Sequence, residues 1–207
     1  MDIISIEEKG KTKYRITTQD GVVFVMTKRE AALYGIRGTE SVEKLSLPEE
    51  MWEALWAGLY KAAIRRCGDL LKGRDYTRTG LLQKLREDEY PEEIALQAVR
   101  AMEEAHYVDD RRFAQTYLHY HLQDRSRGRI RQDLRQKGVP AEVIEEAFAE
   151  AAEEENLEER ELGQIRALLE KKRYDPRTAD WPQKQKMMAF LYRRGFSQEL
   201  IRRAVEE

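Results

Sequence analysis

One helical pattern occurs three times in this chain, and the repetition constrains the fold more than any other feature of the sequence. Three stretches align without gaps when one leucine of each is placed in register: 81–99 on Leu85, 129–148 on Leu134 and 186–205 on Leu191. These anchor leucines are 49 and 57 residues apart, and the eight additional residues of the second spacing fit an insertion around 175–182. Three ordered matches of this length exceed what a chance pattern of apolar residues gives. The chain is therefore a tandem repeat.

The residues after each anchor leucine predict a turn between two helices. An apolar residue follows five positions later, with a helix-starting residue directly after it, in the pairs Tyr90-Pro91, Val139-Pro140 and Phe196-Ser197. Gly138 and Gly195 suit a left-handed helix cap, whereas the first repeat has Glu89 there, so we expect that turn to be strained or built differently. An alanine thirteen residues after each anchor lets two helices approach closely; these are Ala98, Ala147 and Ala204. A further helix precedes each pair, at 62–71, 112–122 and 162–171, which gives three helices per repeat.

The first 26 residues have a different pattern, with short β-prone runs separated by turn signals such as Asp20-Gly21. Thr27 is placed to cap a short helix through Tyr34, and Pro48 lies near the first turn of the next helix. We predict a mainly α fold in which three tandem three-helix repeats form an elongated, curved body behind a small N-terminal β element with a short helix. The predicted division is 1–50 for the β-containing domain and 51–108, 109–155 and 156–207 for the repeats.

Composition and simple motifs exclude several classes of function. The net charge is only −2 although 37% of residues are charged, so bulk charge does not draw the molecule to nucleic acid. Cys67 is the only cysteine, which rules out an intramolecular disulfide and a cysteine zinc cluster. The first residues lack a basic stretch followed by an apolar one, and no apolar run approaches the roughly 18 residues that span a bilayer. We expect a cytoplasmic protein that does not enter a membrane.

No pattern of catalytic or metal-binding residues stands out. The glycine-rich phosphate loop of nucleotide hydrolases is absent. His119 and His121 are two residues apart, which places them on different sides of a helix and makes them poor metal partners. Asp109 and Asp110 suit a helix start, with Asp110 as the cap and Asp109 favouring the helix dipole. We therefore predict no enzymatic activity, no cofactor and no metal.

The charges are distributed unevenly, and this predicts binding surfaces. A basic stretch with few acids inside it opens the middle helix of the second repeat; it comprises Arg125, Arg127, Arg129, Arg131, Arg135 and Lys137. Within it Arg127, Arg131 and Arg135 share one helix face, and the glutamate-rich stretch 142–161 follows directly. A second basic cluster lies in the third repeat and includes Lys184, Lys186, Arg193 and Arg194. Tyr117, Tyr120 and Phe113 are candidate aromatic anchors, although Phe113 also suits the core.

The alternative to a binding surface is that each cation is solvated or forms an ion pair within its own helix. As a group, the basic stretch favours a partner, which is either DNA phosphate or an acidic protein surface. A steep loss of affinity with salt would indicate phosphate, because phosphate contacts release counterions. A weaker dependence on salt would indicate a protein interface with aromatic anchors.

Four patches of sequence resemble the RecX family, the bacterial regulators of the RecA recombinase. The first is Arg74-x-x-Thr77-x-x-Gly80-Leu81-x-x-Lys84-Leu85, in which Gly80 stands where the family usually has glutamate. The other three are Tyr107-Val-Asp-Asp110-x-x-Phe113-Ala114, Gly128-x-Ile130-x-x-x-Leu134-x-x-Lys137-Gly138 and Phe190-Leu191-x-x-Arg194-Gly195-Phe196-Ser197. The resemblance extends from about residue 62 to the end, and the N-terminal β segment is similar to the extension of longer members. Arg74 of the first patch joins the candidate contacts.

The resemblance implies a non-catalytic protein that lies in the groove of a RecA filament on single-stranded DNA, and we expect it to be a monomer. There it would lower ATPase and strand-exchange activity and so regulate DNA repair and recombination. Single-stranded DNA would be contacted directly or through RecA.

Two alternatives remain open from the residues alone. One is a helix-turn-helix DNA-binding protein, for which only the last helix is basic enough to enter a groove. The other is a helical scaffold for an unrelated protein partner.

Overall fold

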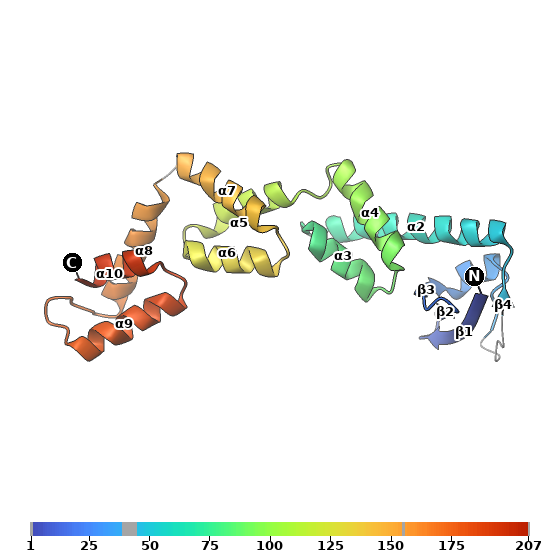
Figure 1. Ribbon diagram of the computed structural model, residues 1–207, viewed down its shortest axis with the longest axis horizontal. Helices are drawn as coiled ribbons and strands as arrows, with labels where there is room; N and C mark the ends of the chain where they lie inside the picture. Colours follow the sequence, from blue (N-terminus) through green and yellow to red (C-terminus); the bar gives the residue numbers. More distant parts are fainter. Residues whose placement is uncertain (1, 39–44, 155, 207) are drawn as a thin grey trace. The chain divides into compact units, whose positions relative to one another are not determined.

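In the computed structural model the chain forms two compact units, Met1–Asp109 and Asp110–Glu207. The structure describes residues 2–38, 45–154 and 156–206. The predicted repeat boundary at residue 155 therefore lies outside the described residues, and the four-part division stays a prediction. The described elements are mainly helices, preceded by a small antiparallel sheet, which confirms the predicted fold class (Figure 1). None of the described helices is long and apolar enough to cross a membrane.

The first unit begins with a four-stranded antiparallel sheet in the order β3-β2-β1-β4. Its strands are β1 (Asp2–Lys9), β2 (Lys13–Thr18), β3 (Val23–Thr27) and β4 (Leu45–Ser46). Alternate residues such as Ile16 and Phe24, which pair across β2 and β3, are fully buried, so one face of the sheet forms a core. Strand β4 was not predicted, because two residues are too few to show a periodic pattern.

Two helices join the sheet to the first repeat. Thr27 caps α1 (Lys28–Leu33) in a capping box with Glu30, as the sequence predicts, and Gly35 follows with φ of 73°. Helix α2 (Glu49–Leu71) is one continuous helix that Gly58 does not interrupt. Its Trp52 stacks on Trp56, which also contacts Phe24 of the sheet at 5.8 Å between ring centroids. The two tryptophans therefore pack the helix against the sheet.

The single cysteine lies in the part of α2 that belongs to the first repeat. Cys67 is fully buried, and this burial raises the pKa of its thiol to about 11. Helices α3 (Arg78–Glu87) and α4 (Glu92–Glu104) pack on α2 and complete the first three-helix group. Thr77 caps α3 by accepting a hydrogen bond from the backbone N–H of Gly80 at 2.9 Å.

The turn between α3 and α4 is built differently from the other two, as the sequence predicts. Glu89 adopts a left-handed conformation with φ of 59°, where Gly138 and Gly195 have 81° and 86°. Its carboxylate lies 2.7 Å from Lys9 Nζ and 2.8 Å from Arg15 Nε, so two cations of the sheet hold the side chain. These ion pairs help offset the cost of roughly 1 kcal/mol that a side chain carries in this conformation.

The second unit contains two more three-helix groups. The first is α5 (Asp110–His121), α6 (Arg127–Gln136) and α7 (Ala141–Glu154), and the second is α8 (Leu157–Lys171), α9 (Trp181–Arg193) and α10 (Gln198–Glu206). The anchor leucines are fully buried in all three groups, and the recurring alanines are buried too. The residues ten positions after the anchors, Ala95, Ile144 and Ile201, are equally buried and form a core column that the alignment did not single out.

Inside the second unit, the start of α6 packs directly on the turn between α9 and α10. Ser126 Oγ donates a hydrogen bond to the backbone oxygen of Arg194 at 2.5 Å. A Cβ atom added to Gly128 would lie 2.3 Å from the backbone oxygen of Gly195, so only glycine fits at this contact. Gln164 also donates to the backbone oxygen of Leu122 at 2.7 Å. We call this set of contacts the repeat 2–3 junction.

Candidate interaction surfaces

Most arginines of the basic stretch have carboxylate partners. Asp133, which is 7% exposed, lies 2.7 Å from Arg125 and 3.0 Å from Arg129. The Tyr117 hydroxyl accepts a hydrogen bond from Arg125 at 2.8 Å and donates to Asp133 at 3.2 Å. A charge buried at this depth requires such partners, so Arg125, just before α6, and Arg129, within it, both compensate an acid of α6.

Two further arginines pair with acids of neighbouring helices. Arg127 Nε lies 2.5 Å from Glu161 of α8, whose carboxylate also accepts the Arg127 backbone N–H at 3.0 Å. Glu161 is 3% exposed, so this pair is a buried part of the repeat 2–3 junction. Arg131 lies 2.8 Å from Glu145 of α7, and its hydrogen bond is the largest influence holding the pKa of that carboxyl below its ordinary value.

Arg135 differs from the arginines before it. It is exposed, and among the residues that the structure describes no carboxylate lies within ion-pairing distance of it. Lys137, at the end of the same helix, has its Nζ 5.7 Å from the Tyr117 ring centroid. The stretch itself contains Asp133, and α7 and α8 bring Glu145 and Glu161 alongside it, so four of its arginines are already paired. That the stretch binds a partner stays a prediction, and Arg135 is its best-placed residue.

The cations of the third repeat are arranged differently. Within the described chain, Lys184, Lys186 and Arg193 of α9 have no carboxylate at ion-pairing distance, and Arg194 lies 4.8 Å from the Phe190 ring centroid. Of the α9 residues only Leu191 is fully buried, and Trp181 and Tyr192 are 72% and 60% exposed. Helix α9 therefore presents cations and aromatic rings to solvent together.

Arg74, the one candidate in the first unit, lies just before α3. Its guanidinium carbon is 4.6 Å from the centroid of the Tyr76 ring, a cation–π distance. Arg74 itself is exposed, so it is available for contact with a partner.

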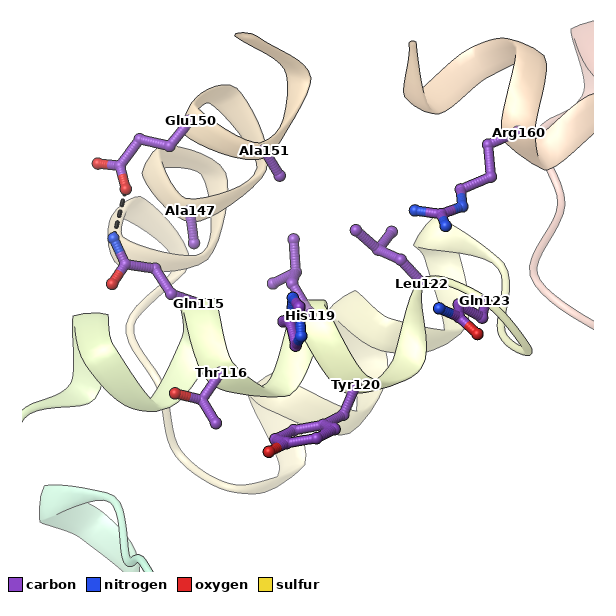
Figure 2. A pocket seen from close by; sticks show the side chains of 11 residues that line it. Gln115, Thr116, His119, Tyr120, Leu122, Gln123, Ala147, Glu150, Ala151 and Arg160 are labelled. Carbon is purple, nitrogen blue, oxygen red and sulfur yellow. Dashed lines mark hydrogen bonds between the residues drawn. The ribbon is translucent and has the colours of Figure 1, made fainter. Parts of the chain in front are cut away.

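The aromatic candidates of α5 fall into two groups. Phe113 and Tyr117 are partly buried against the core, whereas Tyr120 is 72% exposed. Tyr120 and His119 line a cavity of about 620 Å³ among α5, α7 and α8, into which Arg160 extends from α8 (Figure 2). At its edge the Gln115 amide donates a hydrogen bond to Glu150. Tyr120 is thus the only one of the three whose ring is largely open to a partner.

The acids and histidines of α5 also have plain structural positions. Helix α5 begins at Asp110, so Asp110 lies in its first turn and Asp109 directly precedes the helix. Among the described residues no three His, Cys, Asp or Glu side chains gather as metal ligands would.

These features define a class of protein: a tandem array of three-helix domains whose charged and aromatic side chains are displayed on helix surfaces. Residues 109–147 match the family model of the second three-helix domain of RecX, and residues 158–205 match that of the third. A Regulatory protein RecX of Trichlorobacter lovleyi is 36% identical over 152 residues, which cover 72% of this chain and 94% of that protein. Another, of Chlorobaculum tepidum, is 33% identical and covers 72% and 89% respectively.

The chain belongs to the RecX family. A crystal structure of regulatory protein RecX has a similar fold, with a TM-score of 0.65 at 23% identity, and the match covers 100% of this chain and 99% of that one. Since this match includes the N-terminal sheet, the sheet is part of the shared fold.

Proposed function

We propose that this protein is a non-catalytic regulator that binds RecA filaments on single-stranded DNA and lowers their ATPase and strand-exchange activity. Membership of the RecX family carries the proposal, because the relatives are named regulatory proteins. Under this proposal the protein acts as a monomer in the cytoplasm and thereby regulates DNA repair and recombination. The repeats supply the binding surface, as stacked helical units do in other repeat proteins.

The ion pairs divide the candidate contacts into two groups. A partner that recruits Arg125, Arg127 or Arg129 must first take it from a buried carboxylate, and leaving that carboxylate unpaired is costly. Arg135 and the α9 cations Lys184, Lys186 and Arg193 have no such cost. We therefore assign the direct contacts to these four cations and a mainly structural role to the paired arginines. Arg74, which is exposed before α3, is a further candidate contact.

Steady-state ATP hydrolysis by RecA on single-stranded DNA tests the proposal. Substoichiometric amounts of this protein should lower the hydrolysis rate, and the protein should co-sediment with the filaments. Unchanged hydrolysis together with no co-sedimentation would show that the chain does not act on RecA.

The division of the cations is tested with single charge reversals. Arg135→Glu should weaken filament binding while the thermal unfolding midpoint stays that of the wild type. Arg100→Glu is a control, because Arg100 is an exposed residue of α4 that pairs with Glu104 and is not a predicted contact. If both variants bind as the wild type does, the assigned surface on α6 is wrong.

A further inference from the structure

One edge of the N-terminal sheet opens into a cavity of the first unit. Strand β3 ends the sheet on this side, and among the described residues it pairs only with β2. Three consecutive residues of β3, Val25, Met26 and Thr27, line a cavity of about 420 Å³ whose other walls come mainly from α1 and α2. Adjacent side chains of a strand point to opposite faces, so a cavity that all three line runs along the strand's edge. We call this cavity the β3 groove.

The backbone of Val25 is available for pairing on this edge. Beside it in the chain, the Thr27 N–H donates to the Glu30 carboxylate at 3.0 Å and so points away from β2. The next N–H, that of Lys28, donates to the backbone oxygen of Thr12 at 2.8 Å and so points toward the β2 side. Because inward and outward groups alternate along an antiparallel strand, Val25 has the orientation of Thr27. Within the described chain its outward N–H and C=O have no hydrogen-bond partner.

The wall formed by α1 and α2 is apolar and fixed in place. Leu33 ends α1 and is 74% exposed, and together with the half-buried Val25 it gives the groove an apolar rim. The Tyr34 hydroxyl donates to the backbone oxygen of Ala54 in α2 at 3.2 Å. Gly58 leaves room for this contact, since a Cβ atom there would lie 2.5 Å from the hydroxyl oxygen. The wall is therefore preformed, which lowers the ordering cost of binding.

Three cations at the groove lack carboxylate partners. Lys61 and Arg65 lie one turn apart on α2, and Lys13 begins β2. Across the described ranges none of the three has a carboxylate within ion-pairing distance, whereas Arg66 in the same lining pairs with Asp88. The two carboxylates of the lining are engaged in the cap of α1 and in an ion pair at the end of α2. The groove therefore carries uncompensated positive charge beside its open strand edge.

We propose that the β3 groove binds an extended peptide segment with acidic side chains, which adds as a further strand to the edge of β3. The backbone of the segment pairs with the outward N–H and C=O of Val25. Its apolar side chains cover Leu33, and its carboxylates face Lys61 and Arg65. Nucleic acid would satisfy the cations, but it has no row of amide groups at strand spacing and would leave the apolar rim uncovered. The observations therefore favour a peptide.

A matched pair of peptides tests this mode of binding. Fluorescence anisotropy measures binding of a short labelled peptide of alternating glutamate and valine to the full-length protein. The second peptide has the same sequence with every backbone nitrogen methylated, so it keeps its charge and loses its N–H donors. The first peptide should bind saturably, and the methylated one should bind at least about tenfold more weakly, because the hydrogen bonds to β3 are lost.

Variants of the protein locate the site. Lys61→Glu with Arg65→Glu should lower the affinity on the order of tenfold, because two attractions become repulsions. Lys11→Glu with Arg37→Glu, which reverses two exposed cations of the same unit outside the groove, should lower it by less than about twofold. Val25→Pro should also weaken binding, since proline at an outward-facing edge position removes a donor without disturbing the pairing with β2. Circular dichroism checks that each variant is folded.

Amide hydrogen exchange followed by NMR gives a readout at single residues. The peptide should slow exchange of the Val25 N–H, which points outward in the free protein. The amides of Phe24 and Met26 have the opposite orientation and already face β2, so their exchange should change little. Equal protection of all three amides would indicate a general stabilisation of the sheet in place of an added strand, and it would contradict the proposal.

Four further results would overturn the proposal. The wild type might fail to bind the alternating peptide, or it might bind the methylated peptide equally well, which would indicate charge alone. Unlabelled oligo(dT) might displace the labelled peptide as effectively as unlabelled peptide does, which would assign the groove to nucleic acid. Sedimentation might show a dimer that Val25→Pro dissociates, which would assign the edge to a second copy of this chain. None of these measurements contains RecA, so their outcome is independent of the proposed function.

Discussion

Alanine at position 128 should break the repeat 2–3 junction. The added Cβ atom would lie 2.3 Å from the backbone oxygen of Gly195, whereas Cβ contacts below 3.0 Å are essentially not found. The obstacle is main chain in a left-handed turn, with φ of 86° at Gly195, so no side chain can rotate out of the way. Either α6 or the α9–α10 turn must therefore move by about 0.7 Å or more.

The structure indicates how large the effect should be. Overpacking of this kind costs about 1–3 kcal/mol. The shift also strains the bond from Ser126 Oγ to Arg194, whose loss would add about 1 kcal/mol. Alanine in a helix recovers at most about 1 kcal/mol relative to glycine. The net loss should be about 1–3 kcal/mol, which for a unit of about 100 residues lowers the unfolding temperature on the order of 10 °C.

Thermal unfolding followed by circular dichroism measures this change, and the chain offers a matched control. Gly163 lies inside α8, and a Cβ there would meet nothing within 4 Å. Gly163→Ala should accordingly stabilise the same unit by about 0.5–1 kcal/mol. Equal stabilisation by Gly128→Ala and Gly163→Ala would refute the close contact. Hydrogen exchange at the start of α6 and in the α9–α10 turn should accelerate only in the Gly128 variant.

Three further changes test how two ion pairs and one helix cap contribute to the stability of the fold. Glu89→Gln should destabilise the first unit at neutral pH, because the carboxylate pairs with Lys9 and Arg15 and its folded pKa lies below the ordinary value of 4.5. The difference from wild type in urea unfolding should be full above pH 4.5 and vanish as the pH falls through the lowered pKa; a difference independent of pH would contradict this. Gly80→Glu should raise the free energy of unfolding by about 0.5–1 kcal/mol, because it completes a capping box with Thr77. A free energy of unfolding below that of the wild type would mean that the Cβ does not fit beside Thr77 Oγ1. Arg127→Glu should lower the free energy of unfolding by about 3–5 kcal/mol, since it leaves Glu161 buried beside a like charge, while Arg135→Glu should change it by less than about 0.5 kcal/mol.

The repeat architecture could be predicted because its determinants are local. The anchor leucines, the turn residues and the alanines fix helix ends and packing faces within about twenty residues, and all of them occupy the expected positions. The unusual turn at Glu89 was predicted for the same reason, since only its lack of glycine was needed. The ion pairs that hold Glu89 come from the sheet and have no local signal.

The charged surfaces were harder to predict, because charge compensation is non-local. Glu161 lies 34 residues from Arg127, and no local pattern in the sequence around either residue predicts that they pair. Conversely, Lys172 and Arg173 were not chosen as candidates although the fold brings them beside Lys186 and Arg193. A sequence shows which faces are basic, but only the packed structure shows which cations are already neutralised.

The state of Cys67 makes this protein convenient for site-specific labelling. A thiol that is fully buried, with a pKa of about 11, is almost entirely protonated at neutral pH and does not reach a maleimide dye. A cysteine introduced on the exposed face of α9, for example Ala189→Cys, would then be the only reactive thiol in the chain. One substitution in an otherwise native sequence would thus place a fluorescent reporter among the exposed cations and rings of α9.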